Sequence, residues 1–157
     1  MTALQPLTGT QVKNRLHAYN PGGSLEHDLQ ALWQDAGGII RDCARAHFGE
    51  SAVELVERHY TTRVDANWVQ DTANVGQRLY REKQSVPDYI ATRDRMISDI
   101  IERMFDDFAD DQPRLRKLVI ATQRLTSYET DIILAQVALL EAEAAAAKSE
   151  ARKVEAD

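Results

Sequence analysis

Cysteine is nearly absent from this sequence, which has one residue of this type, Cys43, among 157. A single cysteine excludes an intrachain disulfide and any CxxC zinc site, and it suits a reducing compartment. Aromatic residues are also sparse, at 6%. Alanine, leucine, glutamate, arginine and glutamine are plentiful instead, a composition that favours helices over sheets.

Long apolar runs and an excess of positive charge are also missing. No stretch approaches the roughly 20 apolar residues that span a bilayer, and the N-terminus has no apolar segment typical of a signal peptide. The net charge is −6, and the basic residues are interleaved with acidic ones. We therefore expect a cytoplasmic protein without nucleic-acid or membrane partners, of a length that fits one domain.

Strand signals are lacking as well, whereas apolar residues recur at three- and four-residue steps throughout the chain. Ser24 and Asp65 suit helix N-caps, Ser51-Ala-Val-Glu54 reads as a capping box, and Ser85-Val-Pro87-Asp88 is a strong helix start. These signals predict an all-α fold. The expected helices cover residues 11–19, 24–48, 51–62, 65–84, 86–108 and 113–157. Within the second, Gly37-Gly38 predicts a bend or a closely packed backbone.

The last predicted helix carries apolar residues on more than one face. One stripe contains Leu118, Leu125, Tyr128, Ile132 and Leu139, and the other contains Val119, Ile133, Val137 and Leu140. A helix that is apolar around most of its circumference is buried on two sides. We interpret one side as a homodimer contact, a four-helix bundle formed by Ile132, Ile133, Val137 and Leu140. The alternative is a central helix in a monomer.

Beyond Leu140 the sequence is rich in alanine and charge, with high helix propensity and almost nothing to fill a core. Such a segment is typical of a semi-rigid helical spacer, and a frayed terminal helix is the alternative. We therefore divide the chain into a lead-in with a short helix (1–23), a main domain (24–140) and a helical linker toward a downstream output domain (141–157).

Catalytic motifs are not evident. The sequence has no GxSxG, P-loop, HExxH or glycine-rich dinucleotide turn, so we expect no enzyme activity. Cys43 and His47 could form a nucleophilic pair, but both lie on an apolar stripe, which favours a core cysteine. The acidic residues near 106–111 lack EF-hand spacing, and the four histidines lack metal-ligand spacing, so no metal site is predicted.

A family resemblance rests mainly on residues 65–140. Asp65-Ala-Asn-Trp68 and Val75-Gly76 are similar to the helix that enters the haem-proximal region of the sensor globin domain of bacterial globin-coupled sensors. Pro87 and Tyr89 resemble the start of that family's next long helix. The run from Leu125 through Asp131 to Leu134 resembles its final helix. The resemblance implies a globin-like fold.

Two departures from the family pattern concern the haem pocket. The family's proximal histidine stands three residues after the glycine, where this sequence has Leu79. The segment between Phe48 and Asp65 is also shorter than the family norm. The resemblance therefore implies a globin-like domain without haem, whose vestigial pocket is lined by Trp68, Val75, Leu79, Tyr89 and His59. In the alternative, His59 supplies an axial ligand.

The function implied by the resemblance is signal relay. The chain would be a dimeric sensory domain, ahead of an output module such as a chemoreceptor signalling domain, a cyclic-dinucleotide synthase or a histidine kinase. Its stimulus would be a small ligand or a partner protein. Two alternatives stay open: a haem-binding sensor of oxygen or another gas, and a helical protein–protein adaptor without a functional pocket.

Overall fold

The computed structural model describes residues 3–156, in which 86% of the chain is helix and no strand occurs. The prediction of an all-α protein is confirmed. The elements are α1 (Gly9–Tyr19), the 3₁₀ turn η1 (Pro21–Gly23), α2 (Ser24–Phe48), α3 (Ser51–Thr61), α4 (Ala66–Arg81), α5 (Val86–Asp107) and α6 (Gln112–Ala156).

The N-cap predicted at Ser24 is wrong, because Ser24 is already helical and the N-cap position of α2 is Gly23, without a side-chain cap. Side-chain caps set other helix starts. The carboxylate of Asp65 accepts from the Trp68 amide at 3.2 Å, and the Ser85 hydroxyl accepts from the Asp88 amide at 3.2 Å, both as predicted. The capping box predicted at Ser51 is wrong, because the preceding Glu50 already has helical φ and ψ and its side chain makes no cap. The reciprocal bonds of a capping box occur instead between Thr8 and Gln11 at the start of α1.

The N-terminal segment is integrated into the body of the protein more closely than a lead-in would be. Residues 1–2 of the predicted 1–23 segment lie outside the described residues. Leu7 and Val12 belong to the hydrophobic core. Asp131 of α6 binds both Arg15, at 2.8 Å, and the hydroxyl of Tyr19. These contacts fix α1 against the middle of α6.

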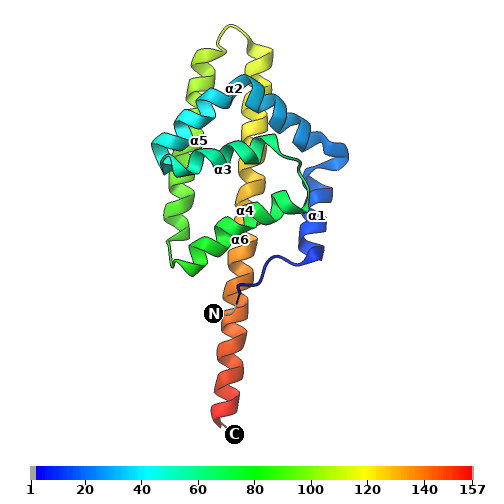
Figure 1. Ribbon diagram of the computed structural model, residues 1–157, viewed down its shortest axis with the longest axis vertical. Helices are drawn as coiled ribbons and strands as arrows, with labels where there is room; N and C mark the ends of the chain where they lie inside the picture. The colour runs from blue at the N-terminus through cyan, green and yellow to red at the C-terminus, as the bar shows by residue number, and fades with distance from the viewer. Residues whose placement is uncertain (1–2, 157) are drawn as a thin grey trace.

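Helix α2 continues through Gly37 and Gly38, and Figure 1 shows that it bends part-way along. A Cβ at Gly37 would lie 3.2 Å from the Trp33 ring, whereas nothing lies within 4 Å of a Cβ at Gly38. A bend in this helix was one of the two outcomes predicted from the glycine pair. The close neighbour of Gly37 is a side chain of the same helix rather than another backbone.

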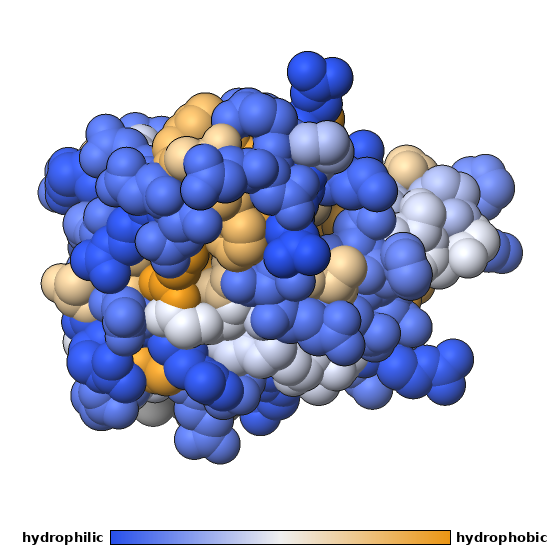
Figure 2. Space-filling model, turned by 90° about the horizontal axis from the view of Figure 1, so that it is seen from above, coloured by the Kyte–Doolittle hydropathy of each residue, from blue (hydrophilic) through white to orange (hydrophobic). Residues whose placement is uncertain are grey.

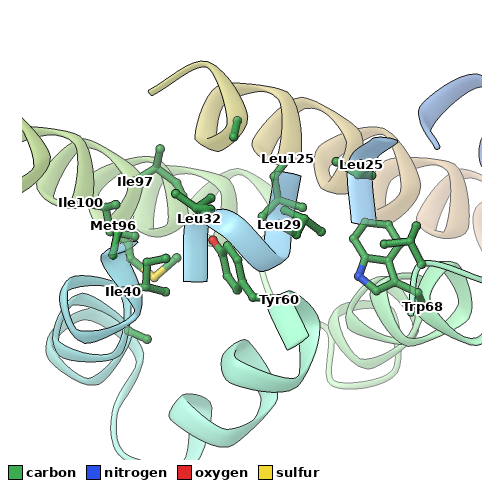
Figure 3. Packing of buried hydrophobic residues seen from close by; sticks show 14 of the residues in the cluster. Leu25, Leu29, Leu32, Ile40, Tyr60, Trp68, Met96, Ile97, Ile100 and Leu125 are labelled. Atoms are coloured by element: carbon green, nitrogen blue, oxygen red, sulfur yellow. The ribbon is translucent and has the colours of Figure 1, made fainter. Parts of the chain in front are cut away.

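The core is built by side chains from every long helix. Figure 3 shows Leu25, Leu29 and Leu32 of α2 facing Leu125 of α6, with Tyr60 and Trp68 reaching in from α3 and α4. Seen from above, hydrophilic side chains cover most of the surface, and apolar ones show through in smaller patches (Figure 2). Among residues 3–156, no helix is both long and apolar enough to cross a membrane.

Helix α6 forms the long axis of the molecule, and its C-terminal third projects away from the other helices (Figure 1). Its 45 residues correspond to a length of about 68 Å at 1.5 Å per residue. Leu140 is its last buried residue, and residues 141–156 are exposed apart from the half-buried Ala144. Residue 157 of the predicted linker lies outside the described residues.

The same chain covers the apolar faces of α6 that we assigned to a dimer contact. The four residues are at most 7% exposed in a single chain: Ile132, Ile133, Val137 and Leu140. Helix α4 packs tightly on this stretch, since a Cβ at Gly76 would lie 2.7 Å from the Ile133 carbonyl oxygen. These side chains are therefore unavailable to a second copy, and a dimer would need other residues. The sequence pattern could not distinguish burial by α4 from burial by a partner.

Candidate functional site

A cavity of about 300 Å³ lies between α3, α4 and α5. The C-terminal end of α2 contributes Phe48, and α6 contributes Glu129. This volume is at the lower end of the range of about 300–1,000 Å³ that is typical of small-molecule sites. Through Glu129, the cavity is therefore in contact with α6, the helix whose C-terminal third projects from the other helices.

Four of the five side chains that we expected in a pocket line this cavity: His59, Trp68, Val75 and Tyr89. Leu79 does not line it, although it is only 1% exposed. Its neighbour Arg78 does line the cavity, so Leu79 is buried beside the lining without contributing to it. The position where the resemblance places a proximal histidine is therefore outside this cavity.

A buried ion pair borders the cavity. The Arg93 side chain is 5% exposed, and its Nη2 lies 3.0 Å from Glu129 Oε1. Arg93 also donates to the Thr130 hydroxyl at 2.7 Å and to the Thr126 carbonyl oxygen at 3.2 Å. All three partners belong to α6, so this one arginine of α5 fixes a turn and a half of the exit helix.

His59 contacts the carboxylate oxygen of Glu129 that Arg93 does not bind. Its ring stacks on Trp68 with the ring centroids 4.2 Å apart. Its Nε2 lies 3.3 Å from the Thr72 hydroxyl and 3.4 Å from Glu129 Oε2. The Trp68 indole N–H donates to the His59 carbonyl oxygen at 2.9 Å. Glu129 therefore connects His59 of α3 with Arg93 of α5.

Burial controls the protonation of the lining groups. It lowers the pKa of His59, although Glu129 acts in the opposite direction. It also raises the pKa values of Tyr60 and Tyr89, with Glu129 adding to that effect. Burial by itself lowers the pKa of Arg93, but Glu129 and neighbouring groups raise it by more, so the pKa of Arg93 is raised. At neutral pH the site therefore combines a neutral imidazole, two phenols and an internally balanced ion pair.

Arg93 and Glu129 could not be identified as site residues from the sequence. Each is a charged residue in a helix where most charged residues are exposed, and only the packing of α5 on α6 brings them together. His59 was proposed as a pocket residue through the family resemblance, whereas its partner Thr72 was not singled out.

His59 is the only histidine in the lining, and its Nε2 already contacts Thr72 and Glu129. Within residues 3–156, no three His, Cys, Asp or Glu side chains are grouped so that they could hold a metal ion.

Among residues 3–156, no hydrogen bond joins Cys43 to His47. Cys43 is 0% exposed, and burial, with Asp99 next, raises the pKa of its thiol to about 11. His47 Nε2 lies 3.2 Å from Asp99 Oδ2 instead. The interpretation of Cys43 as a core residue is consistent with this burial.

A second hollow, of about 550 Å³, lies between α2 and the start of α6. This hollow is larger than the first cavity, but ion pairs between α2 and α6 lie along it. Arg124 Nη1 lies 2.8 Å from Asp28 Oδ2, and Arg114 Nε lies 3.8 Å from Asp35 Oδ2. The first cavity is the better candidate site because it contains buried polar groups beside apolar walls.

Comparison of the chain with protein-family models, with curated proteins and with solved structures gave no match.

Proposed function

We propose that this protein is a dimeric, haem-free, globin-like relay domain that responds to a small ligand and passes the signal along α6. One observation carries the proposal. The cavity contacts α6 through Glu129, and the same helix continues for 16 residues after its last buried residue, Leu140. A change in the cavity and a change at the exit of the domain therefore act on one helix.

The relay step follows from the buried polar groups. Glu129 is bound by Arg93 and faces His59, and both of these side chains line the cavity. A ligand that displaces Arg93 or His59 removes a contact with Glu129 and so changes the interactions of one turn of α6. Because packed helices have discrete arrangements, such a local change is converted into sliding or rotation of the helix.

The dimer contact that we propose uses apolar side chains that remain exposed. Ile120 and Leu134 of α6 are 46% and 43% exposed. Fourteen residues separate them, which places them within about 40° of each other around the helix. Phe105 of α5 is 53% exposed. Pairing of two such faces would form a four-helix bundle of α5 and α6 from each copy. We place this dimer in the cytoplasm, ahead of an output domain.

The relay is tested by measuring the separation of the two exit helices. A nitroxide on a Ser149→Cys variant reports the distance between copies by pulsed electron resonance, while the buried Cys43 stays unlabelled. We expect one distance in the unmodified domain and a different distribution with Glu129→Gln. The control Glu141→Gln changes an exposed carboxylate of the same helix and should leave the distribution unaltered. No dipolar signal between copies would contradict the proposal.

The haem-binding alternative has one observation in its favour, the presence of His59 in the cavity. It predicts a Soret band after expression with added haem, and loss of that band in His59→Ala. We expect no such band, because the His59 imidazole is engaged by Thr72 and Glu129. The adaptor alternative predicts that Glu129→Gln alters stability but leaves the separation of the exit helices unchanged.

A further inference from the structure

We infer that the cavity between α3, α4 and α5 takes a small carboxylate with an apolar body, its charged end lying at the cavity mouth beside Arg58 and Arg78. This inference deepens the proposed relay function and rests on the cavity that carries it. It is argued from the distribution of charge and apolar surface around that cavity.

The inner part of the cavity has no free charge to offer a ligand. The cation of Arg93 is matched by Glu129, and its two terminal nitrogens bind groups of α6. His59 is held neutral by burial. A ligand charge placed at this depth would have no partner of opposite sign, and an unpaired buried charge is strongly unfavourable.

The walls favour an apolar body. They include Phe48, Tyr89, Met96 and Ile97, and the rings of Phe48 and Tyr89 lie 5.7 Å apart in a tilted arrangement. Aromatic and aliphatic walls of this kind bind the apolar part of a ligand by excluding water from both surfaces. The volume of about 300 Å³ restricts that part to a small group.

The mouth of the cavity is where positive charge is available. Arg58 of α3 and Arg78 of α4 are exposed residues that line the cavity. Neither guanidinium forms an ion pair with any group in residues 3–156. Asp71 is the only acidic residue among the exposed lining groups, so the mouth has a net charge of +1 (two arginines less one aspartate). Planar guanidinium groups match carboxylates well.

Phenylacetate and its neutral analogue phenylacetamide are suitable probes, because they share the apolar body and differ in charge. Binding is followed by NMR through the indole N–H of Trp68, which lines the cavity. The indole of Trp33 lies outside the lining and serves as an internal reference, identified by Trp33→Phe. We expect a saturable shift of the Trp68 signal, with phenylacetate binding about threefold to tenfold more tightly than the amide.

Four substitutions of exposed side chains locate the charge. Arg58→Gln and Arg78→Gln should each weaken phenylacetate binding about twofold to fivefold, and Asp71→Asn should strengthen it by a similar factor. Arg81→Gln removes an exposed cation from the same helix, outside the cavity lining, and should have no comparable effect. Addition of 1 M salt should weaken binding of phenylacetate but not of the amide.

Each outcome bears on the inference. Equal affinity for the two probes, or binding of phenylacetate that survives Arg78→Gln unchanged, would overturn the assignment of an anion while leaving a ligand-responsive relay in place. Absence of any Trp68 shift with both probes would overturn the inference as well. Failure of the relay itself is read separately, from the exit-helix distance in Glu129→Gln, which needs no ligand.

Discussion

Gly76 illustrates how a single residue controls the distance between two helices. A Cβ at this position would lie 2.7 Å from the Ile133 carbonyl oxygen and 3.1 Å from the Gln136 Cβ. Backbone cannot move aside as a flexible side chain can, so α4 could not approach α6 as closely with any larger residue.

Gly76→Ala should therefore lower the free energy of unfolding by about 1–3 kcal/mol, the usual cost of overpacking a core. The measurement is urea denaturation followed by circular dichroism. Gly38→Ala is the matched control, because it lies inside a helix with nothing within 4 Å of its Cβ. That control should raise stability by about 0.5–1 kcal/mol. Equal effects of the two substitutions would show that α4 and α6 are not in close contact.

His59 gives the protein a pH-dependent stability. Burial lowers the pKa of His59 from 6.5 in the folded state, with Glu129 opposing. Below pH 6.5 the unfolded chain binds a proton there that the folded protein does not, so stability falls as the pH decreases from 6.5 toward the folded-state pKa. The slope is at most about 1.4 kcal/mol per pH unit for one group.

Denaturation at pH 7 and pH 5 tests this linkage. His59→Gln should reduce the loss of stability between the two pH values, whereas His17→Gln, at an exposed position of α1, should leave it unaltered. An identical loss in His59→Gln and the unmodified protein would mean that another group is responsible.

At the scale of elements, α6 consists of two parts with different roles. Up to Leu140 its buried side chains contribute to the core, and after Leu140 they are exposed except for the half-buried Ala144. Alanine-rich helix with little tertiary contact is stabilised by propensity alone. The position of the exit segment therefore depends on α6 itself and not on packing against the other helices.

Truncation separates the two parts. A chain ending at residue 143 should retain its free energy of unfolding within about 0.5 kcal/mol, because the removed residues bury almost no surface. A chain ending at residue 135 loses the buried side chains of Gln136, Val137 and Leu140, and it should unfold at room temperature. Thermal denaturation distinguishes the two chains. A large loss in the longer one would show that the exit segment packs on the domain.

At the scale of the whole molecule, the exposed apolar residues of α5 and α6 decide whether two copies associate. Ile120 and Leu134 share one face of α6, and Phe105 is the most exposed large apolar residue of α5. Isolated exposed apolar residues are common, but two on one face of α6 suit a contact between copies.

Light scattering at micromolar concentration should give the mass of a dimer, and Leu134→Glu should convert it to a monomer with unchanged helix content. Val154→Glu is the control, since Val154 is 73% exposed and lies far along the exit segment. A monomer in the unmodified protein would exclude this contact.

The all-helical fold, most helix starts and the bend of α2 could be predicted because they depend on neighbouring residues. Asp65 and Ser85 accept from amides three residues away, and the apolar stripes repeat at the helical period. The family resemblance proposed five pocket residues, of which His59, Trp68, Val75 and Tyr89 line the cavity and Leu79 does not. Local logic misplaced the capping box at Ser51, where the backbone of Glu50 is already helical.

Only the tertiary structure decided which inward-facing residues meet. Periodicity shows that Ile133 is buried, but α4, which packs on it, ends more than 50 residues earlier in the sequence. The contacts of Glu129 with Arg93 and His59 likewise join residues 36 and 70 positions apart. Such pairs leave no trace in a single sequence, because helix packing, rather than local propensity, selects one partner among many equivalent charges.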